Sequence, residues 1–199
     1  RRFGGLRRLH GDAAYARLRA ARLAVVGVGG VGSWAAEALA RCGVASLVLI
    51  DLDHVAESNV NRQVQALSAT LGQAKVQALR ERIADIHPGC KVVGVEEFVE
   101  PGNWPQLLPA VPDAVIDACD QVRAKTAMAA WARGQREAGF VSVGAAGGKR
   151  LAHKLDIDDL SKVTHDPLLA QLRYRLRKHM ARPARARRWA FLACSAARP

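Results

Sequence analysis

The 199-residue sequence lacks the features of a membrane-spanning or secreted chain, and it contains few cysteines. No apolar run approaches the roughly 18 residues of a transmembrane helix. The opening Arg1-Arg2-Phe3-Gly4-Gly5 has no apolar signal-peptide core. The cysteines are scattered and form no CxxC pair, which argues against a zinc ribbon and for a reduced compartment. We therefore expect a cytoplasmic protein without zinc and without membrane association; the four cysteines are Cys42, Cys90, Cys119 and Cys194.

Acidic residues are scarce in the last part of the chain, and the formal net charge is +12. From Asp166 to the end there are nine basic residues and one acid. Such a stretch suits a polyanion such as RNA, although a solvated helix face followed by a disordered tail would have the same composition. Residues 180–199 are mainly Ala, Arg and Pro and can bury little surface. We expect residues 179–199 to be a disordered basic tail.

Apolar runs alternate with helix-like segments from Leu23 to Gly144. Short apolar runs that end in Gly or Asp are typical of buried parallel strands, and the alanine-rich segments between them have helix start and stop signals. The alternation predicts an α/β, doubly wound, mainly parallel Rossmann-like sheet with helices on both faces, in one domain of residues 1–178. Strands are expected at 23–28, 46–51, 91–95, 114–117 and 140–143, and helices at 6–22, 33–42, 72–86 and 122–137, with a polar loop and a helix over 158–178.

A glycine-rich turn follows the first predicted strand. It fits the pattern GxGxxG, with an additional glycine, and comprises Gly27, Gly29, Gly30 and Gly32. Glycine lets the backbone turn tightly and lets a phosphate approach it, and the N-terminus of the next helix favours an anion. Asp51, at the end of the second strand, is placed to accept hydrogen bonds from a ribose. These features predict a nucleotide site; the motif alone would favour NAD.

The long polar loop after Asp51 favours ATP instead. Arg62 and Lys75 are cations that can reach a triphosphate, and cleavage of a phosphoanhydride needs cations to stabilise the leaving pyrophosphate. Taken singly, Arg62 could be a surface ion-pair partner and Lys75 a solvated helix lysine. The same loop contributes Asp53, Asn59 and Gln63, all at the edge of the sheet where α/β proteins bind ligands.

Two further carboxylates follow the fourth predicted strand in Asp117-Ala118-Cys119-Asp120. A carboxylate here could hold Mg²⁺ against the phosphates. Asp120 could instead cap the helix that begins at Val122. We assign Asp117 and Asp120 to the nucleotide site, and Asp120 to Mg²⁺.

This set of motifs resembles the superfamily of ubiquitin-activating-like adenylating enzymes, which includes the activators of sulfur-carrier proteins. The motifs are Gly27–Gly32, Asp51-Leu52-Asp53, residues 58–63, Gly72-Gln73-Ala74-Lys75 and 117–120. The resemblance implies that Asp51 holds the ribose and that Arg62 and Lys75 bind phosphates. It also implies that Asp120 handles Mg²⁺ at the site of adenylation, so Arg62, Lys75 and Asp120 are the expected catalytic residues.

Four other stretches resemble, within that superfamily, the dehydratases that act on threonylcarbamoyladenosine in tRNA: residues 2–6, 32–41, 122–125 and 159–169. This resemblance implies a tRNA substrate modified next to the anticodon. ATP would adenylate the threonyl carboxylate, and the carbamoyl oxygen would then close a ring and expel AMP. It further implies a homodimer, a monovalent cation and a cysteine desulfurase or sulfur-acceptor partner.

The sequence departs from the superfamily in three places. Carrier-activating relatives usually have CxxC zinc ligands soon after the fifth strand, whereas residues 147–153 contain no cysteine. Gly5 stands where many of them have an arginine that acts across a dimer, which leaves Arg7 or Arg8 as candidates. The composition after residue 178 is unlike the family, and we expect a truncated or out-of-frame end. Activation of a sulfur-carrier or ubiquitin-like protein, a nucleotide-binding remnant without turnover and an NAD dehydrogenase stay open as alternatives.

Overall fold

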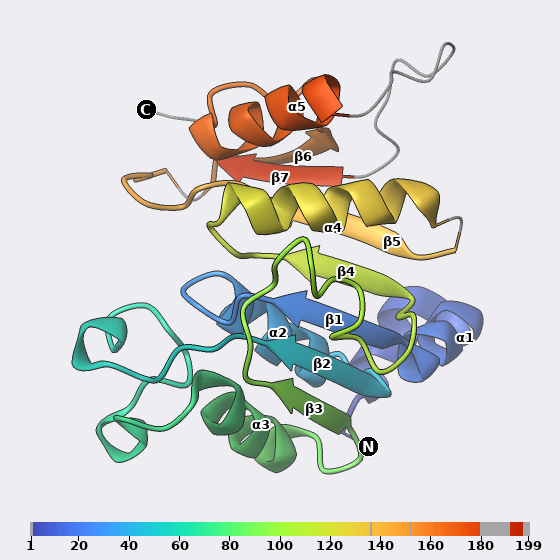
Figure 1. Cartoon of the computed structure of the whole chain (residues 1–199). Helices are drawn as coiled ribbons and strands as arrows, with labels where there is room; N and C mark the ends of the chain where they lie inside the picture. Colours follow the sequence, from blue (N-terminus) through green and yellow to red (C-terminus); the bar gives the residue numbers. More distant parts are fainter. Residues whose placement is uncertain (1, 136, 152, 180–191, 197–199) are drawn as a thin grey trace. The chain divides into compact units, whose positions relative to one another are not determined.

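The structure is a computed structural model that describes residues 2–135, 137–151, 153–179 and 192–196 (Figure 1). The chain divides into two compact units, with the boundary between Phe98 and Val99. Both units combine strands with helices, as the α/β prediction requires. In the described ranges, no helix is both long enough and apolar enough to cross a membrane.

The first unit is built on three parallel strands in the order β3-β2-β1 (Figure 1). Helices α2 and α3 connect consecutive strands, which is the βαβ arrangement that the alternation predicts. In chain order the elements are α1 (Gly4–Ala20), β1 (Arg22–Val26), α2 (Gly32–Arg41), β2 (Ser46–Ile50), the 3₁₀ turns η1 (Glu57–Asn59) and η2 (Ser68–Thr70), α3 (Lys75–Ile86) and β3 (Lys91–Val95).

The register of this sheet brings the ends of its strands together. Val26 pairs with Ile50, and Ile50 pairs with Val95. The loops after β1 and β2 therefore begin from the same edge of the sheet. The core of this unit lies along the two central strands, where Ala24, Val25, Leu47 and Leu49 have no exposed surface. Burial of these apolar side chains fixes where the two loops start.

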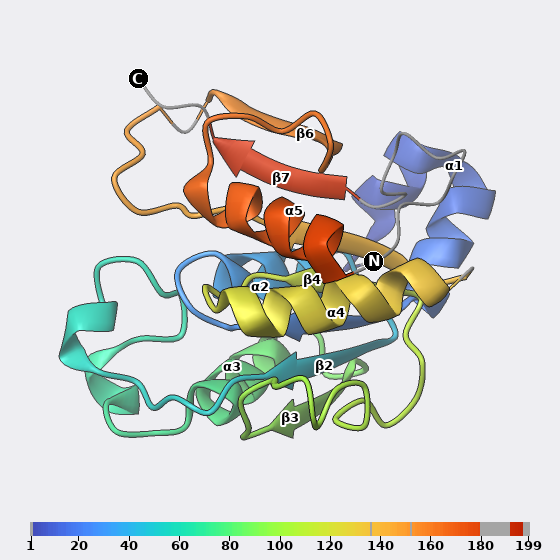
Figure 2. The same cartoon turned by 45° about the horizontal axis from the view of Figure 1, so that its top comes forward.

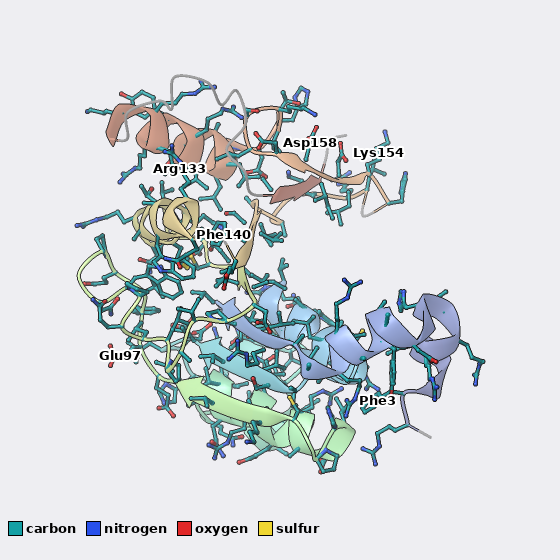
Figure 3. The ribbon with its side chains drawn as sticks, turned by 90° about the vertical axis from the view of Figure 1, so that its right-hand side faces the viewer. Phe3, Glu97, Arg133, Phe140, Lys154 and Asp158 are labelled. Atoms are coloured by element: carbon teal, nitrogen blue, oxygen red, sulfur yellow. The ribbon has the colours of Figure 1, made fainter. Side chains whose placement is uncertain are left out.

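Helix α1 differs from the predicted lead-in helix over 6–22. It begins at Gly4, ends at Ala20 and is broken at Gly11, where φ is +77°. None of its residues is buried, so few tertiary contacts constrain its bounds. Its start is held by Phe3, labelled in Figure 3, whose ring lies edge-on to His87 with centroids 4.8 Å apart. The Arg19 guanidinium lies 4.8 Å above the same ring.

The second unit contains parallel strands β4, β5 and β7, and β6 pairs antiparallel with β7. Helices α4 and α5 pack against each other and are seen side by side in Figure 2. The elements are β4 (Ala114–Asp117), α4 (Val122–Gly134), β5 (Gly139–Val143), β6 (Leu155–Asp159), α5 (Pro167–His179) and β7 (Leu192–Ala196).

Strands β6 and β7 correct the sequence-based expectations. The segment that contains β6 had no predicted strand, and β7 lies in the tail that we expected to be disordered. Leu192 to Ala196 form a strand because β5 and β6 pair with them on either side and because Ala193 is fully buried. The expectation of disorder is therefore wrong for these five residues and for His179, which is the last residue of α5. For residues 180–191 and 197–199 the same expectation lies outside the described residues. The domain boundary at residue 178 stays a prediction.

Candidate functional site

The glycine turn lies between β1 and α2, as the motif predicts. Gly27 has a φ of +81°, a left-handed conformation that favours glycine, and its N–H donates to the Ile50 carbonyl at 2.8 Å. Helix α2 starts at Gly32, has no acidic residue in its first turn, and no described side chain caps it. Its first N–H groups therefore face the turn without a competing side-chain acceptor, which suits a phosphate.

Arg62 lies against this turn. A Cβ atom added to Gly30 would come within 3.3 Å of both Cγ and Cδ of Arg62. The Arg62 guanidinium donates to the Ser58 carbonyl at 2.8 Å and to Asn61 Oδ1 at 3.0 Å, and it remains exposed. The indole of Trp34 donates to the Arg62 carbonyl at 2.9 Å. The predicted phosphate-binding cation is thus held beside the glycines.

Asp51 is nearly buried at the carboxyl end of β2. Its Oδ2 accepts from the Val28 N–H at 2.8 Å and its Oδ1 accepts from the Asp53 N–H at 2.9 Å. Burial raises the pKa of the Asp51 carboxyl, although these two N–H groups and the nearby Lys75 oppose the shift. Each oxygen keeps a second lone pair that could accept from a ribose hydroxyl.

Lys75 is the first residue of α3 and is buried rather than solvated. Its ammonium donates to Asp53 Oδ2 at 2.7 Å, and its backbone N–H donates to the Asp53 carbonyl at 2.9 Å. The side chain therefore lies close to Asp51 and Asp53. A phosphate at this point would compete with Asp53 for the ammonium group.

Asn59 and Gln63 are both buried and shape the loop. Asn59 Oδ1 accepts from the Ala56 N–H at 3.0 Å and closes η1. The Gln63 amide nitrogen is 4.0 Å from the position of a Cβ on Gly29, so this side chain lies near the turn. The structure thus places Asp51, Arg62 and Gln63 against the glycine turn, and it joins Asp53 and Lys75 to Asp51. Asn59 supports the loop that carries Arg62 and Gln63. Nucleotide contacts by each of these residues stay predictions.

Asp117 and Asp120 belong to the second unit. Asp117 has no exposed surface; its Oδ2 lies 3.0 Å from Lys125 Nζ and accepts from Ser142 Oγ at 2.7 Å. Lys125 also donates to the Val143 carbonyl at 2.8 Å. These contacts give Asp117 an internal structural role, and its assignment to the nucleotide stays a prediction.

Asp120 is exposed in the turn between β4 and α4. It does not cap α4, because Gln121 occupies the cap position and no described side chain completes that cap. Its neighbour Cys119 is partly buried, and burial, reinforced by Asp117, raises the pKa of that thiol well above its usual range. Cys119 is therefore a poor candidate for a nucleophile.

No group of three or more His, Cys, Asp or Glu residues among the described ranges could hold a metal ion. Mg²⁺ bound with a nucleotide usually takes one or two carboxylates together with phosphate oxygens. An exposed carboxylate such as Asp120 fits that requirement by itself.

The sequence analysis assigned no role to three residues that support these loops and strand ends: Trp34, Gln65 and Lys125. Trp34 and Lys125 lie within the stretches 32–41 and 122–125 that carry the resemblance, whereas Gln65 lies outside every motif. A signal existed for Lys125, since it lies on the same helical stripe as the buried Ala124 and Met128. A lysine on that stripe needs a buried partner. Gln65 and Trp34 carried no comparable pattern.

The parallel βαβ units and the glycine turn define a nucleotide-binding, Rossmann-like domain. The model of the ThiF family matches residues 4–149. The chain is 43% identical over 177 residues to the tRNA threonylcarbamoyladenosine dehydratase of Haemophilus influenzae, covering 89% of this chain and 67% of that protein. It is 46% identical over 176 residues to the Escherichia coli enzyme of the same name, covering 88% of this chain and 65% of that enzyme.

The crystal structure of the E. coli dehydratase in complex with ATP has a TM-score of 0.92 to this chain at 41% identity, covering 98% of this chain and 80% of that one. The predicted α/β Rossmann-like class is thereby confirmed. The chain belongs to the ThiF family and, within it, to the family of tRNA threonylcarbamoyladenosine dehydratases. It spans about two thirds of the length of the curated relatives that it matches.

Proposed function

We propose that this chain is an ATP-dependent enzyme that cyclises N6-threonylcarbamoyladenosine in tRNA, next to the anticodon, with net loss of water. The observation that carries the proposal is the grouping of Asp51, Arg62 and Lys75 around the glycine turn. Family membership supports it, because the matched relatives are named as dehydratases of this nucleoside and one of them was crystallised with ATP.

In the first step the threonyl carboxylate attacks the α-phosphorus of ATP, and pyrophosphate leaves. The glycine turn and the start of α2 would hold the phosphates with N–H groups. Arg62 and Lys75 would stabilise the charge that develops on pyrophosphate. Asp51 would accept hydrogen bonds from the ribose, and Asp120 would hold Mg²⁺, which shields phosphate charge.

In the second step the carbamoyl oxygen attacks the acyl adenylate and forms a ring, while its nitrogen loses a proton. AMP leaves with one of the carboxylate oxygens, so the nucleoside loses one water in total. The attack is intramolecular and gains from proximity, so it needs no side-chain nucleophile.

The test is incubation of the purified chain with ATP and tRNA that carries the modified nucleoside, followed by mass spectrometry of the digested tRNA. We expect the mass of one water to disappear from the nucleoside, with release of AMP. Arg62→Ala and Asp120→Ala should abolish this loss. Pyrophosphate exchange that requires the C-terminus of a carrier protein, with no reaction on tRNA, would contradict the proposal, and so would ATP binding without release of AMP.

We further propose that the chain acts in the cytoplasm as a homodimer, with Arg7 or Arg8 reaching the partner's site. We also propose a monovalent cation and a cysteine desulfurase or sulfur-acceptor partner, on the same resemblance. Both arginines are exposed on α1, where they could reach a second copy. Light scattering that reports a monomer would contradict the dimer.

A further inference from the structure

Gln65 is a buried polar residue of the loop after β2, and it touches the glycine turn. Only 1% of its surface is exposed. Its amide nitrogen donates to the carbonyl of Val28, the second residue of the turn, at 2.9 Å. A longer contact of 3.4 Å joins the same nitrogen to Gln63 Oε1. A polar side chain buried this deeply, with its donor directed at the turn, requires a reason.

Side-chain hydrogen bonds hold both peptide groups that flank Val28, the one before its Cα atom and the one after it. The Val28 N–H donates to Asp51 Oδ2 at 2.8 Å, and the Val28 carbonyl accepts from Gln65. Side chains therefore restrain both peptide planes. Since Val28 has no exposed surface, packing restrains it as well.

Restraint of the Val28 carbonyl also orients the next N–H group. The peptide bond is planar and trans, so the Gly29 N–H points opposite to the Val28 carbonyl. Gln65 draws that carbonyl toward the loop, and the Gly29 N–H therefore points away from Gln65. The described residues provide no acceptor for this N–H. In a glycine turn such an N–H is a phosphate ligand.

The Gln65 amide has one usable orientation. Its Oε1 is buried and has no hydrogen-bond partner within the described residues. Exchange of the amide oxygen and nitrogen would place two acceptors against each other at Val28. The Gln65 backbone is fixed in turn, because its carbonyl accepts from Thr70 Oγ1 at 2.7 Å. The buried Oε1 of Gln65 thus stays without a hydrogen bond, while its Nε2 donates to the Val28 carbonyl.

We infer that Gln65 is a positioning residue that sets the Val28–Gly29 peptide so that the Gly29 N–H faces the phosphates of ATP. Gln65 itself does not contact the nucleotide. The inference rests on the proposed function, because it assumes that ATP binds at this turn.

The first test compares the wild-type chain with Gln65→Met, which keeps the length of the side chain and removes the donor. We expect the Kd for ATP to rise about tenfold, while the Kd for adenosine, which has no phosphate, stays within error. Titration calorimetry measures the Kd for ATP and the Kd for adenosine, at a temperature well below that at which each variant unfolds. Gln77→Met is the matched control. Among the described residues, the only hydrogen bond of the Gln77 side chain is to Glu81 on α3, so this variant should bind ATP like the wild type.

The second test is Gln65→Glu. A buried carboxyl group protonates above its usual pKa, and it can donate to the Val28 carbonyl only when it is protonated. Relative to the wild type, this variant should therefore lose affinity for ATP as the pH rises. A purely structural role would not produce that profile. An ATP affinity of Gln65→Glu that follows the wild type at every pH would overturn the inference.

The two proposals fail differently. If the wild-type chain does not bind ATP, the proposed function falls and the inference falls with it. If the wild type binds ATP but Gln65→Met binds it equally well, or weakens adenosine as much as ATP, only the inference is overturned.

Discussion

At the scale of single residues, Gly30 has little room for a side chain because Arg62 lies against it. A Cβ atom on Gly30 would lie 3.3 Å from two carbons of the Arg62 side chain, which is tighter than ordinary contact. Gly30→Ala should therefore move Arg62 away from the turn. We expect the KM for ATP to rise about tenfold, or about 1.4 kcal/mol, in steady-state assays of AMP release.

A double-mutant cycle separates this displacement from other effects of the extra methyl group. In an Arg62→Ala background there is no long side chain to displace, so Gly30→Ala should add little. The Kd for ATP is measured for all four chains of the cycle, because the Arg62→Ala chains are expected to have no turnover. Equal effects of Gly30→Ala with and without Arg62 would show that the methyl group acts on the turn itself.

Asp51 gives a pH dependence whose direction follows from its burial. Burial raises its pKa in the folded chain above the ordinary value of 3.8. Its contribution to stability is thus fully present below that ordinary value and is lost as the pH rises through the raised pKa. Asp51→Asn does not titrate. The wild type should therefore gain stability relative to Asp51→Asn as the pH falls from about 7 to about 4. The gain in unfolding free energy is about 1.4 kcal/mol for each pKa unit by which Asp51 differs between the folded and unfolded chains.

Urea unfolding of both chains at a series of pH values measures this difference. The comparison removes the titration of the other carboxyl groups, which both chains share. A difference in unfolding free energy that stays constant across the series would contradict the raised pKa.

At the scale of elements, Lys125 ties α4 to the ends of β4 and β5. Its ammonium is fully buried and contacts Asp117, Ser142 and the Val143 carbonyl. Lys125→Met leaves the Asp117 carboxylate buried without its cation, so we expect a loss of about 3–5 kcal/mol in unfolding free energy. Denaturant unfolding monitored through Trp104 and Trp131, which pack together in the second unit, measures it.

The double variant Asp117→Leu with Lys125→Met is the control. Replacing both charges with apolar groups removes the uncompensated carboxylate, so the double variant should be more stable than Lys125→Met alone. A double variant that is less stable than the single one would show that the hydrogen bonds to Ser142 and Val143 matter more than the charge.

The sequence predicts elements well where local signals and burial agree. The bounds of β3 and β4 match the prediction, because apolar residues and turn signals mark both strands. Helix α3 begins at Lys75 rather than at residue 72, since Gly72 has a φ of +81° and Ala74 bridges to His54. Strands β6 and β7 could not be predicted from the sequence, because β6 is rich in Asp and β7 in Ala, which have weak strand preference. Pairing with neighbouring strands determines that these segments are extended.

The candidate site could be predicted where its residues belong to local sequence motifs, and not where packing between elements places them. The cations and carboxylates of the first unit belong to motifs, so their grouping could be expected. Val28 and Gln65 act through backbone and internal contacts, which no residue pattern in one sequence reveals. For Lys125 the sequence offered one signal, its place on the apolar stripe of α4, but not its partners. The burial of Lys75 and Asp117 follows from packing between elements rather than from their local sequence.

At the scale of the whole molecule, the net charge of +12 suits a tRNA partner, and α5 carries part of it. Arg177 and Lys178 are exposed there, whereas Arg173 donates to the carbonyls of Leu160 and Val163 and has a structural role. If the exposed pair contacts phosphates, replacing both with Gln should weaken tRNA binding. The slope of log K against log salt should also fall, by about 0.7–0.9 for each lost contact.

Filter binding of tRNA at several salt concentrations measures both quantities. The matched control is Arg17→Gln with Arg80→Gln, which removes the same charge from exposed positions on α1 and α3. If α5 is a docking surface, its double variant should change the slope more than the control does, because phosphate contacts release counterions and distant charges release fewer. Equal changes would mean that total charge, rather than α5, attracts the tRNA.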